Sequence, residues 1–268
     1  MQLPCPPPEA ATYHTDPRIA QIQAILDHIP AEMLQRHPMA PERPEQCNML
    51  NDWSLIHQAL LAYYEIPSYR DWLFNADYRP AFEAHRRTLQ HLQWHCPGQW
   101  VLKYPKHLIA LEVLLETYPD ARIIWTHRDP GVVIPSVCSF TGYIRSANPS
   151  YDPLRYGPEW TLFEELVLRR GLSVRDRMAD ADTRIHDLYY RDLMADPVAA
   201  VGAAFDQFDI PFSDESARSV QQWIDTHSQT EHGVHRYTAE EFGLDRDHLR
   251  ARFSFYIDRF DVAPEVRA

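Results

Sequence analysis

Four residues with the chemistry of an anion site follow a β-branched and aromatic stretch that predicts a strand over residues 122–127. Arg128 stands at the carboxyl end of that strand, and this edge is where open α/β sheets bind ligands. Asp129 can cap a following helix, and Pro130 suits the first position of a helix, whose free N–H groups attract an anion. Ser136 lies eight residues after Arg128, about two helical turns, so its hydroxyl can share the side of the arginine. These residues indicate a site for a phosphate monoester.

A lysine and a histidine precede this group. Lys103 follows two apolar residues of an expected strand, and a buried ammonium needs an anionic partner, which can be a ligand or a neighbouring carboxylate. His107 precedes an expected helix, and a neutral imidazole near pH 7 suits the removal of a proton from a hydroxyl or amine. The alternative is a histidine that only bonds the backbone at a helix start.

The segments that contain these residues resemble the sulfotransferase family, and most closely a bacterial group within it. A W-x-L-K-x-P-x-H-L segment occupies residues 100–108, and H-R-D-P occupies residues 127–130. The resemblance extends from roughly Asp16 to Val262. Enzymes of this family move a sulfuryl group from 3′-phosphoadenosine-5′-phosphosulfate (PAPS) to an acceptor. For this chain the resemblance implies a small-molecule, glycan or lipid acceptor and no metal.

The resemblance also implies roles for the candidate residues. Arg128 and Ser136 correspond to the pair that binds the 3′-phosphate of the nucleotide. Lys103 would stabilise charge on the departing nucleotide, and His107 would be the general base that takes the acceptor's proton.

Three more residues are candidate nucleotide ligands. Tyr190 opens a Y-x-D-L segment, where a tyrosine in related enzymes lies near the adenine; the alternative is a tyrosine that packs under a helix. His235 and Arg236 lie in a segment at residues 233–244 that resembles the bacterial group. They could replace basic residues that hold the 3′-phosphate in other sulfotransferases, or this segment could simply pack on the sheet.

The family pattern is incomplete at its start. Sulfotransferases begin with a strand, a loop rich in Gly, Thr and Ser, and a helix, which together hold the 5′-phosphosulfate. Here the first glycine is Gly98, and a backbone cradle for phosphate normally needs glycine. We therefore expect the N-terminal strand and phosphate loop to be missing, through truncation, an upstream start or real loss. A sheet without that strand would expose an edge, so we expect the chain to self-associate or to be marginally stable.

Composition limits the other classes of function. The net charge of −12 disfavours nucleic acid, whose phosphates need a basic surface. No apolar run approaches the about 20 residues that span a bilayer. Four scattered cysteines without a C-x-x-C pair indicate reduced thiols and a cytoplasmic protein. The 14 histidines form no recognisable zinc pattern.

The length and the periodicities predict one domain over residues 1–268, with a helical lobe at about 16–95 and a sheet-containing core at about 98–262. Helices are expected over residues 17–29, 45–62, 81–95, 107–118, from 129 onward, 160–179 and 196–208. Strands are expected over residues 100–103, 122–127 and 184–190. The alternation predicts an α/β fold with a three-layer parallel sheet flanked by helices. The resemblance adds that this is a sulfotransferase fold, like that of P-loop nucleotide kinases.

The sequence therefore predicts a PAPS-dependent sulfotransferase. The alternative is a truncated or non-catalytic sulfotransferase-like protein that binds the nucleotide.

Overall fold

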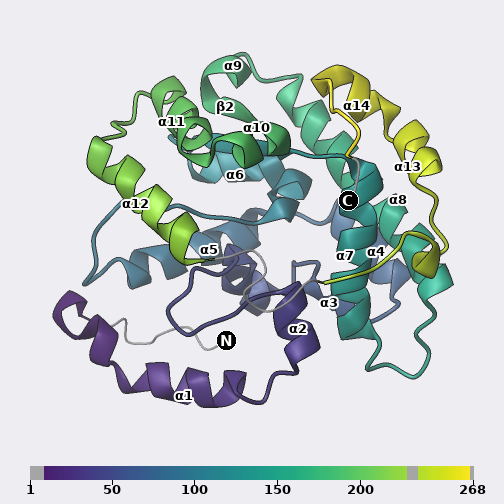
Figure 1. Cartoon of the computed structure of the whole chain (residues 1–268), viewed down its shortest axis with the longest axis horizontal. Coiled ribbons are helices and arrows are strands. Elements are labelled where there is room, and N and C mark those ends of the chain that lie inside the picture. Colours follow the sequence, from purple (N-terminus) through teal and green to yellow (C-terminus); the bar gives the residue numbers. More distant parts are fainter. Residues whose placement is uncertain (1–8, 228–234, 266–268) are drawn as a thin grey trace. The chain divides into compact units, whose positions relative to one another are not determined.

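A computed structural model describes residues 9–227 and 235–265, apart from the side chains of residues 10 and 51–53 (Figure 1). Residues 233 and 234 of the predicted C-terminal segment lie outside the described residues. The packing divides the chain into two compact units. Unit 1 is Met1–Pro119 with Tyr143–Asn148, and unit 2 is Asp120–Gly142 with Pro149–Ala268.

Unit 1 is helical. Its α-helices are α1 (Pro17–Leu26), α2 (Ala31–Arg36), α3 (Ala59–Tyr63), α4 (Pro67–Asn75), α5 (Arg79–Leu92) and α6 (Leu111–Thr117). Its 3₁₀ helices are η1 (Ala10–Thr15), η2 (Cys47–Ser54) and η3 (Pro105–Ala110). The helices predicted at residues 17–29 and 81–95 are confirmed as α1 and α5, and the one predicted at 107–118 begins as η3 before it continues as α6.

One predicted helix is wrong. Residues 45–62 form η2 and α3, not a single helix. Leu55 lies between them with φ 58°, in the left-handed region that a branched side chain rarely adopts. A right-handed helix cannot continue through this residue, so the apolar spacing on either side belongs to two short elements.

The predicted strand at residues 100–103 is also wrong. This segment is extended, but it pairs with no strand among the described residues. The Val101 side chain is 90% exposed, whereas a strand inside a sheet would bury it. The carbonyl of Lys103 instead accepts the backbone N–H of Cys47, at 3.1 Å, at the start of η2.

Unit 2 contains a parallel sheet. Strands β1 (Ile123–His127) and β2 (Ile185–Tyr189) pair in parallel from Ile123 opposite Ile185 to His127 opposite Tyr189. Both strands and their parallel direction are confirmed. The described residues contain only these two strands, so the three-layer sheet stays a prediction.

Helices surround this sheet. They are α7 (Pro130–Arg145, whose end enters unit 1), α8 (Pro153–Arg175), α9 (Ala181–Arg184), α10 (Tyr190–Ala195), α11 (Pro197–Gln207), α12 (Asp214–Thr226), α13 (Arg246–Arg252) and α14 (Ser254–Phe260), with the 3₁₀ helix η4 (Glu240–Phe242). Helices α9, α10 and α11 contact β2 (Figure 1). The predicted helices from residue 129, at 160–179 and at 196–208 are confirmed as α7, α8 and α11. Asp196 caps α11 by accepting the backbone N–H of Ala199 at 2.9 Å.

A titratable histidine lies in the core of unit 1. His85 on α5 is fully buried, and its Nδ1 lies 2.7 Å from the Tyr118 hydroxyl. Its Nε2 is buried without a hydrogen-bond partner among the described residues. Burial lowers the pKa of His85 to about 4. The folded chain therefore holds this imidazole neutral at pH values where the unfolded chain protonates it.

We predict that the free energy of unfolding falls as the pH drops from about 6.5, the ordinary histidine pKa, towards 4. Between these values the unfolded state binds one more proton at His85, which lowers stability by up to about 1.4 kcal/mol per pH unit. Urea unfolding at several pH values measures this slope. His85→Gln, which cannot titrate, should show a flatter curve than the wild type. Parallel curves for the two proteins would contradict the assignment.

Candidate nucleotide and acceptor site

Arg128 follows β1 directly, and its guanidinium holds a carboxylate. Its Nε lies 2.9 and 3.1 Å from the two carboxylate oxygens of Glu265, and its Nη2 lies 2.9 Å from Oε2. The backbone N–H of Asp129 points at the same carboxylate, 3.4 Å from Oε1. The guanidinium carbon also lies 3.8 Å over the centre of the Tyr190 ring. Arg128 thus presents a fixed, half-exposed fork to an oxyanion, which is the geometry that recognises carboxylate or phosphate.

Asp129 caps the helix that follows, as predicted. Its Oδ1 accepts the backbone N–H of Gly131 at 2.9 Å and lies 2.8 Å from Nη1 of Arg250. The carboxylate is buried and fully engaged with these partners. The start of α7 is therefore fixed relative to Arg128.

One predicted residue, Ser136, lies on α7, and a second, His235, contacts this helix. Ser136 is half-buried on this helix. Ser139 lies one turn further on, and its hydroxyl is 2.8 Å from Nε2 of His235. The His235 ring packs against Tyr237 at 4.9 Å, and Tyr237 interacts electrostatically with Arg128. The structure thus brings Arg128 and Tyr190 together, and it places His235 against the helix that carries Ser136.

Two of the predicted nucleotide ligands, Arg236 and Tyr190, differ in their exposure. Arg236 is exposed, so its proposed contact with a nucleotide stays a prediction. Tyr190 is half-buried and stacks on Arg128, an arrangement between the two alternatives that the sequence left open.

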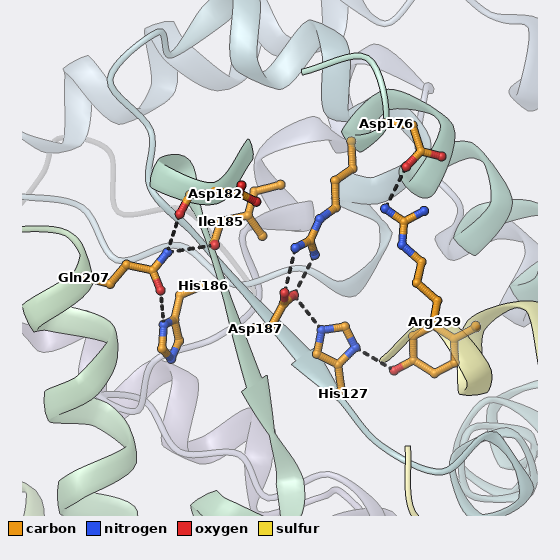
Figure 2. Close-up of polar contacts among 10 residues, drawn as sticks. His127, Asp176, Asp182, Ile185, His186, Asp187, Gln207 and Arg259 are labelled. Carbon is orange, nitrogen blue, oxygen red and sulfur yellow. Dashed lines mark hydrogen bonds and ion pairs between the residues drawn. The ribbon is translucent and has the colours of Figure 1, made fainter. Parts of the chain in front are cut away.

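A buried polar network holds the end of β1 in place. Figure 2 shows the His127 ring between Asp187 of β2 and an aromatic hydroxyl, which belongs to Tyr256 of α14. His127 Nε2 lies 2.8 Å from Asp187 Oδ1, and Nδ1 lies 3.0 Å from the Tyr256 hydroxyl. Arg175 of α8 donates two 2.6 Å hydrogen bonds to the two oxygens of Asp187.

The network reaches Arg128 through Tyr256. The Tyr256 hydroxyl accepts the backbone N–H of Arg128, and burial raises the pKa of this tyrosine. Burial alone would raise the pKa of Asp187, but hydrogen bonds from Arg175 and His127 hold it well below its ordinary value. Asp187 is therefore a permanent anion that fixes His127, and Tyr256 connects His127 to the backbone of Arg128.

His107 lies in unit 1 and lines a small pocket. The other lining residues are mostly apolar or aromatic, with a few polar groups: Ile56, His57, Gln58, Tyr78, Phe82, Tyr104, Lys106, Ile109 and Ala110. Burial and the nearby His85 lower the pKa of His107 to about 3, so the ring is neutral near pH 7. Its Nε2 lies 3.1 Å from Cys47 Sγ. Burial raises the pKa of that thiol to about 11, so Cys47 is protonated and can donate to the imidazole.

The two lysines of this segment lie in different environments. Lys103 is exposed and interacts electrostatically with Glu45, so the expectation of a buried lysine is wrong. This interaction matches the alternative of a carboxylate partner. Lys106 is the buried lysine, and it lines the His107 pocket. Lys103 is exposed because the strand predicted at residues 100–103 does not form. Without a sheet, the alternation of side chains along a strand does not turn Lys103 inward.

Several site residues were not predicted from the sequence. Glu265 lies 137 positions from Arg128, and Cys47 lies 60 positions from His107. No motif or spacing marks either one. The side-chain oxygen of Gln58 is buried in the pocket without a hydrogen-bond partner among the described residues, which is a feature that only the fold can reveal.

The described ranges offer neither a cluster of metal ligands nor a membrane-spanning helix. No cluster of three or more His, Cys, Asp or Glu side chains there could hold a metal ion. None of the helices described combines the length and apolar character needed to cross a bilayer. Among the described residues, Cys47, Cys96 and Cys138 form no disulfide.

Known proteins resemble this chain in sequence and structure. The Sulfotransferase family profile matches residues 1–214. The omega-hydroxy-beta-dihydromenaquinone-9 sulfotransferases Stf3 of Mycobacterium bovis and Mycobacterium tuberculosis are each 25% identical over 188 residues, which are 68% of this chain and 48% of theirs. The chain thus spans about half the length of these curated relatives.

Two crystal structures are similar to the structure described. Sulfotransferase STF9 of Mycobacterium avium superposes with a TM-score of 0.86 at 30% identity, covering 98% of this chain and 69% of that one. Sulfotransferase STF1 of M. tuberculosis H37Rv gives a TM-score of 0.77 at 28% identity, covering 93% and 66%. Since the family profile matches most of the chain and the structures agree, the protein belongs to the sulfotransferase family.

Proposed function

We propose that this protein binds PAPS and transfers its sulfuryl group to a hydroxyl or amine of a small, lipid-like acceptor. The observation that carries the proposal is the guanidinium of Arg128, which already holds two carboxylate oxygens at the end of β1. A phosphate presents oxygens of the same spacing and more charge, so the residues present fit the 3′-phosphate of this nucleotide.

Each residue of the region would have a separate task. Arg128 would bind the 3′-phosphate through its fork, and Ser136 would donate its hydroxyl to the same group. Tyr190 stacks on the guanidinium of Arg128 and fixes its orientation, which favours a two-point contact with the phosphate. His235 is fixed by Ser139 one turn beyond Ser136 and would add a donor at the rim.

The pocket in unit 1 supports the acceptor half of the reaction. Near pH 7 His107 is neutral and can take the proton that the acceptor loses. The buried oxygen of Gln58 can accept a hydrogen bond from the acceptor's hydroxyl or amine. The Stf3 relatives are named as sulfotransferases of a hydroxylated menaquinone, which supports a lipid-like hydroxyl acceptor here.

The chemistry divides between the bound nucleotide and the chain. PAPS supplies the activated sulfuryl group when it is bound. His107 would remove the acceptor's proton, and the acceptor must displace Cys47 Sγ from its 3.1 Å contact with Nε2 to use that nitrogen. Lys103 is proposed to stabilise negative charge on the nucleotide, for which it would exchange its interaction with Glu45.

We predict that Arg128→Ala weakens binding of adenosine 3′,5′-bisphosphate by about 1.5–3 kcal/mol, the scale of hydrogen bonds to charged groups. Isothermal titration calorimetry measures the change. Arg191→Ala is the matched control, because Arg191 is an exposed arginine on the neighbouring helix α10. Equal affinities of the wild type and Arg128→Ala would refute the proposed phosphate site.

We also predict that His107→Ala lowers the turnover number by about 10²–10⁴, the usual contribution of a positioned base. The dissociation constant of the nucleotide should stay unchanged, because His107 acts on the acceptor's proton. Transfer of labelled sulfate to a hydroxylated lipid measures turnover, and exposed His95→Ala is the control. Full activity of His107→Ala would remove it as the base. Absence of transfer by the wild type with intact nucleotide binding would favour the non-catalytic alternative.

A further inference from the structure

The carboxylate on Arg128 comes from the chain itself. Glu265 receives three hydrogen-bond contacts of 2.9–3.1 Å from Arg128, and the N–H of Asp129 points at it as well. An arginine fork with a backbone N–H at a helix start is how proteins hold an oxyanion. Glu265 therefore stands where an anionic ligand of Arg128 would stand.

The chain after α14 is built to aim this carboxylate; we call Asp261–Glu265 the C-terminal strap. Asp261 has φ 48°, and this left-handed turn reverses the chain at the end of α14. Val262 is buried, and its N–H donates to the carbonyl of Ile257 at 3.1 Å. Pro264 has a fixed φ, which restricts the last step before Glu265.

The strap also makes a backbone contact at its tip. The N–H of Glu265 donates to Oδ2 of Asp129 at 2.9 Å. Glu265 is thus held at its backbone by Asp129 and at its side chain by Arg128. The side chain keeps 26% of its surface exposed, so water can solvate the carboxylate when it leaves Arg128.

We propose that Glu265 is an internal competitor for the Arg128 site, so that a nucleotide's 3′-phosphate binds by displacing this carboxylate. This inference rests on the proposed function. Two anions cannot share the fork of Arg128 without strong repulsion. The phosphate therefore binds Arg128 in exchange for the Glu265 carboxylate, which becomes solvated by water. The exchange lowers affinity only for nucleotides that carry a 3′-phosphate. Glu265 thus sets how strongly the site prefers such nucleotides.

The test compares Glu265→Gln with the wild type for two nucleotides. The amide keeps the size of the side chain but loses its charge. Adenosine 3′,5′-bisphosphate should bind about three- to tenfold more tightly to Glu265→Gln, the scale of one partly exposed ion pair. Adenosine 5′-phosphate, which lacks the 3′-phosphate, should bind both proteins equally.

Asp258→Asn is the matched control, because it removes one negative charge from the exposed surface of α14, outside the strap, and leaves Arg128 and Glu265 untouched. Its affinity for the bisphosphate should equal that of the wild type. Glu265→Ala serves as a second variant, and thermal unfolding shows that each protein is folded. Tighter binding of adenosine 3′,5′-bisphosphate by either Glu265 variant, with equal binding of adenosine 5′-phosphate, supports the exchange.

Two results would overturn the inference in different ways. If Arg128→Ala weakens bisphosphate binding but both Glu265 variants bind no more tightly than the wild type, Glu265 only supports Arg128 and the competitor role is wrong. If neither the wild type nor any variant binds the bisphosphate, the proposed function fails and this inference fails with it.

Discussion

The site in unit 2 depends on one partly buried ionic interaction, the pair between Arg175 and Asp187. Two 2.6 Å hydrogen bonds keep Asp187 ionised, and Asp187 then fixes the ring of His127. His127 is 2% exposed and stacks on Phe260 with 4.2 Å between the ring centres, so it has no freedom to reorient. Removing one member of the pair leaves an uncompensated charge, and solvent screening of the partly exposed Asp187 keeps the cost below the about 3–5 kcal/mol of a fully buried pair. The position of Arg128, the next residue, follows from this interaction.

The same unit shows how an acidic chain can carry the proposed anion site. The net charge of the chain is −12, yet the guanidinium of Arg128 lies at the start of α7 and stacks on the ring of Tyr190. Asp129 is neutralised by Arg250 and by the N–H groups it caps, so it does not repel an anion at Arg128. Glu265 balances the remaining charge of Arg128. Local pairing, and not the total charge, decides what this surface binds.

Features that depend on neighbouring residues in sequence were predictable. The strand before Arg128, the cap at Asp129 and the helix of Ser136 all follow from local propensity and capping chemistry. The strand predicted at residues 100–103 is wrong because a strand needs a partner, and this segment pairs with no strand among the described residues. The single helix predicted at residues 45–62 is wrong because the spacing of apolar residues does not reveal the left-handed backbone of Leu55. The contacts of Glu265 and Cys47 join distant parts of the chain, so no pattern in the sequence indicates them.

A crystal structure of this protein with adenosine 3′,5′-bisphosphate would show directly whether Arg128 binds the 3′-phosphate. We expect the 3′-phosphate to lie on the fork of Arg128 within hydrogen-bond distance of Ser136, with the Glu265 carboxylate displaced. The contacts of His127 with Asp187 and Tyr256 should be unchanged, since they fix the arginine in both states. A nucleotide bound elsewhere, with the pair between Arg128 and Glu265 intact, would contradict the account.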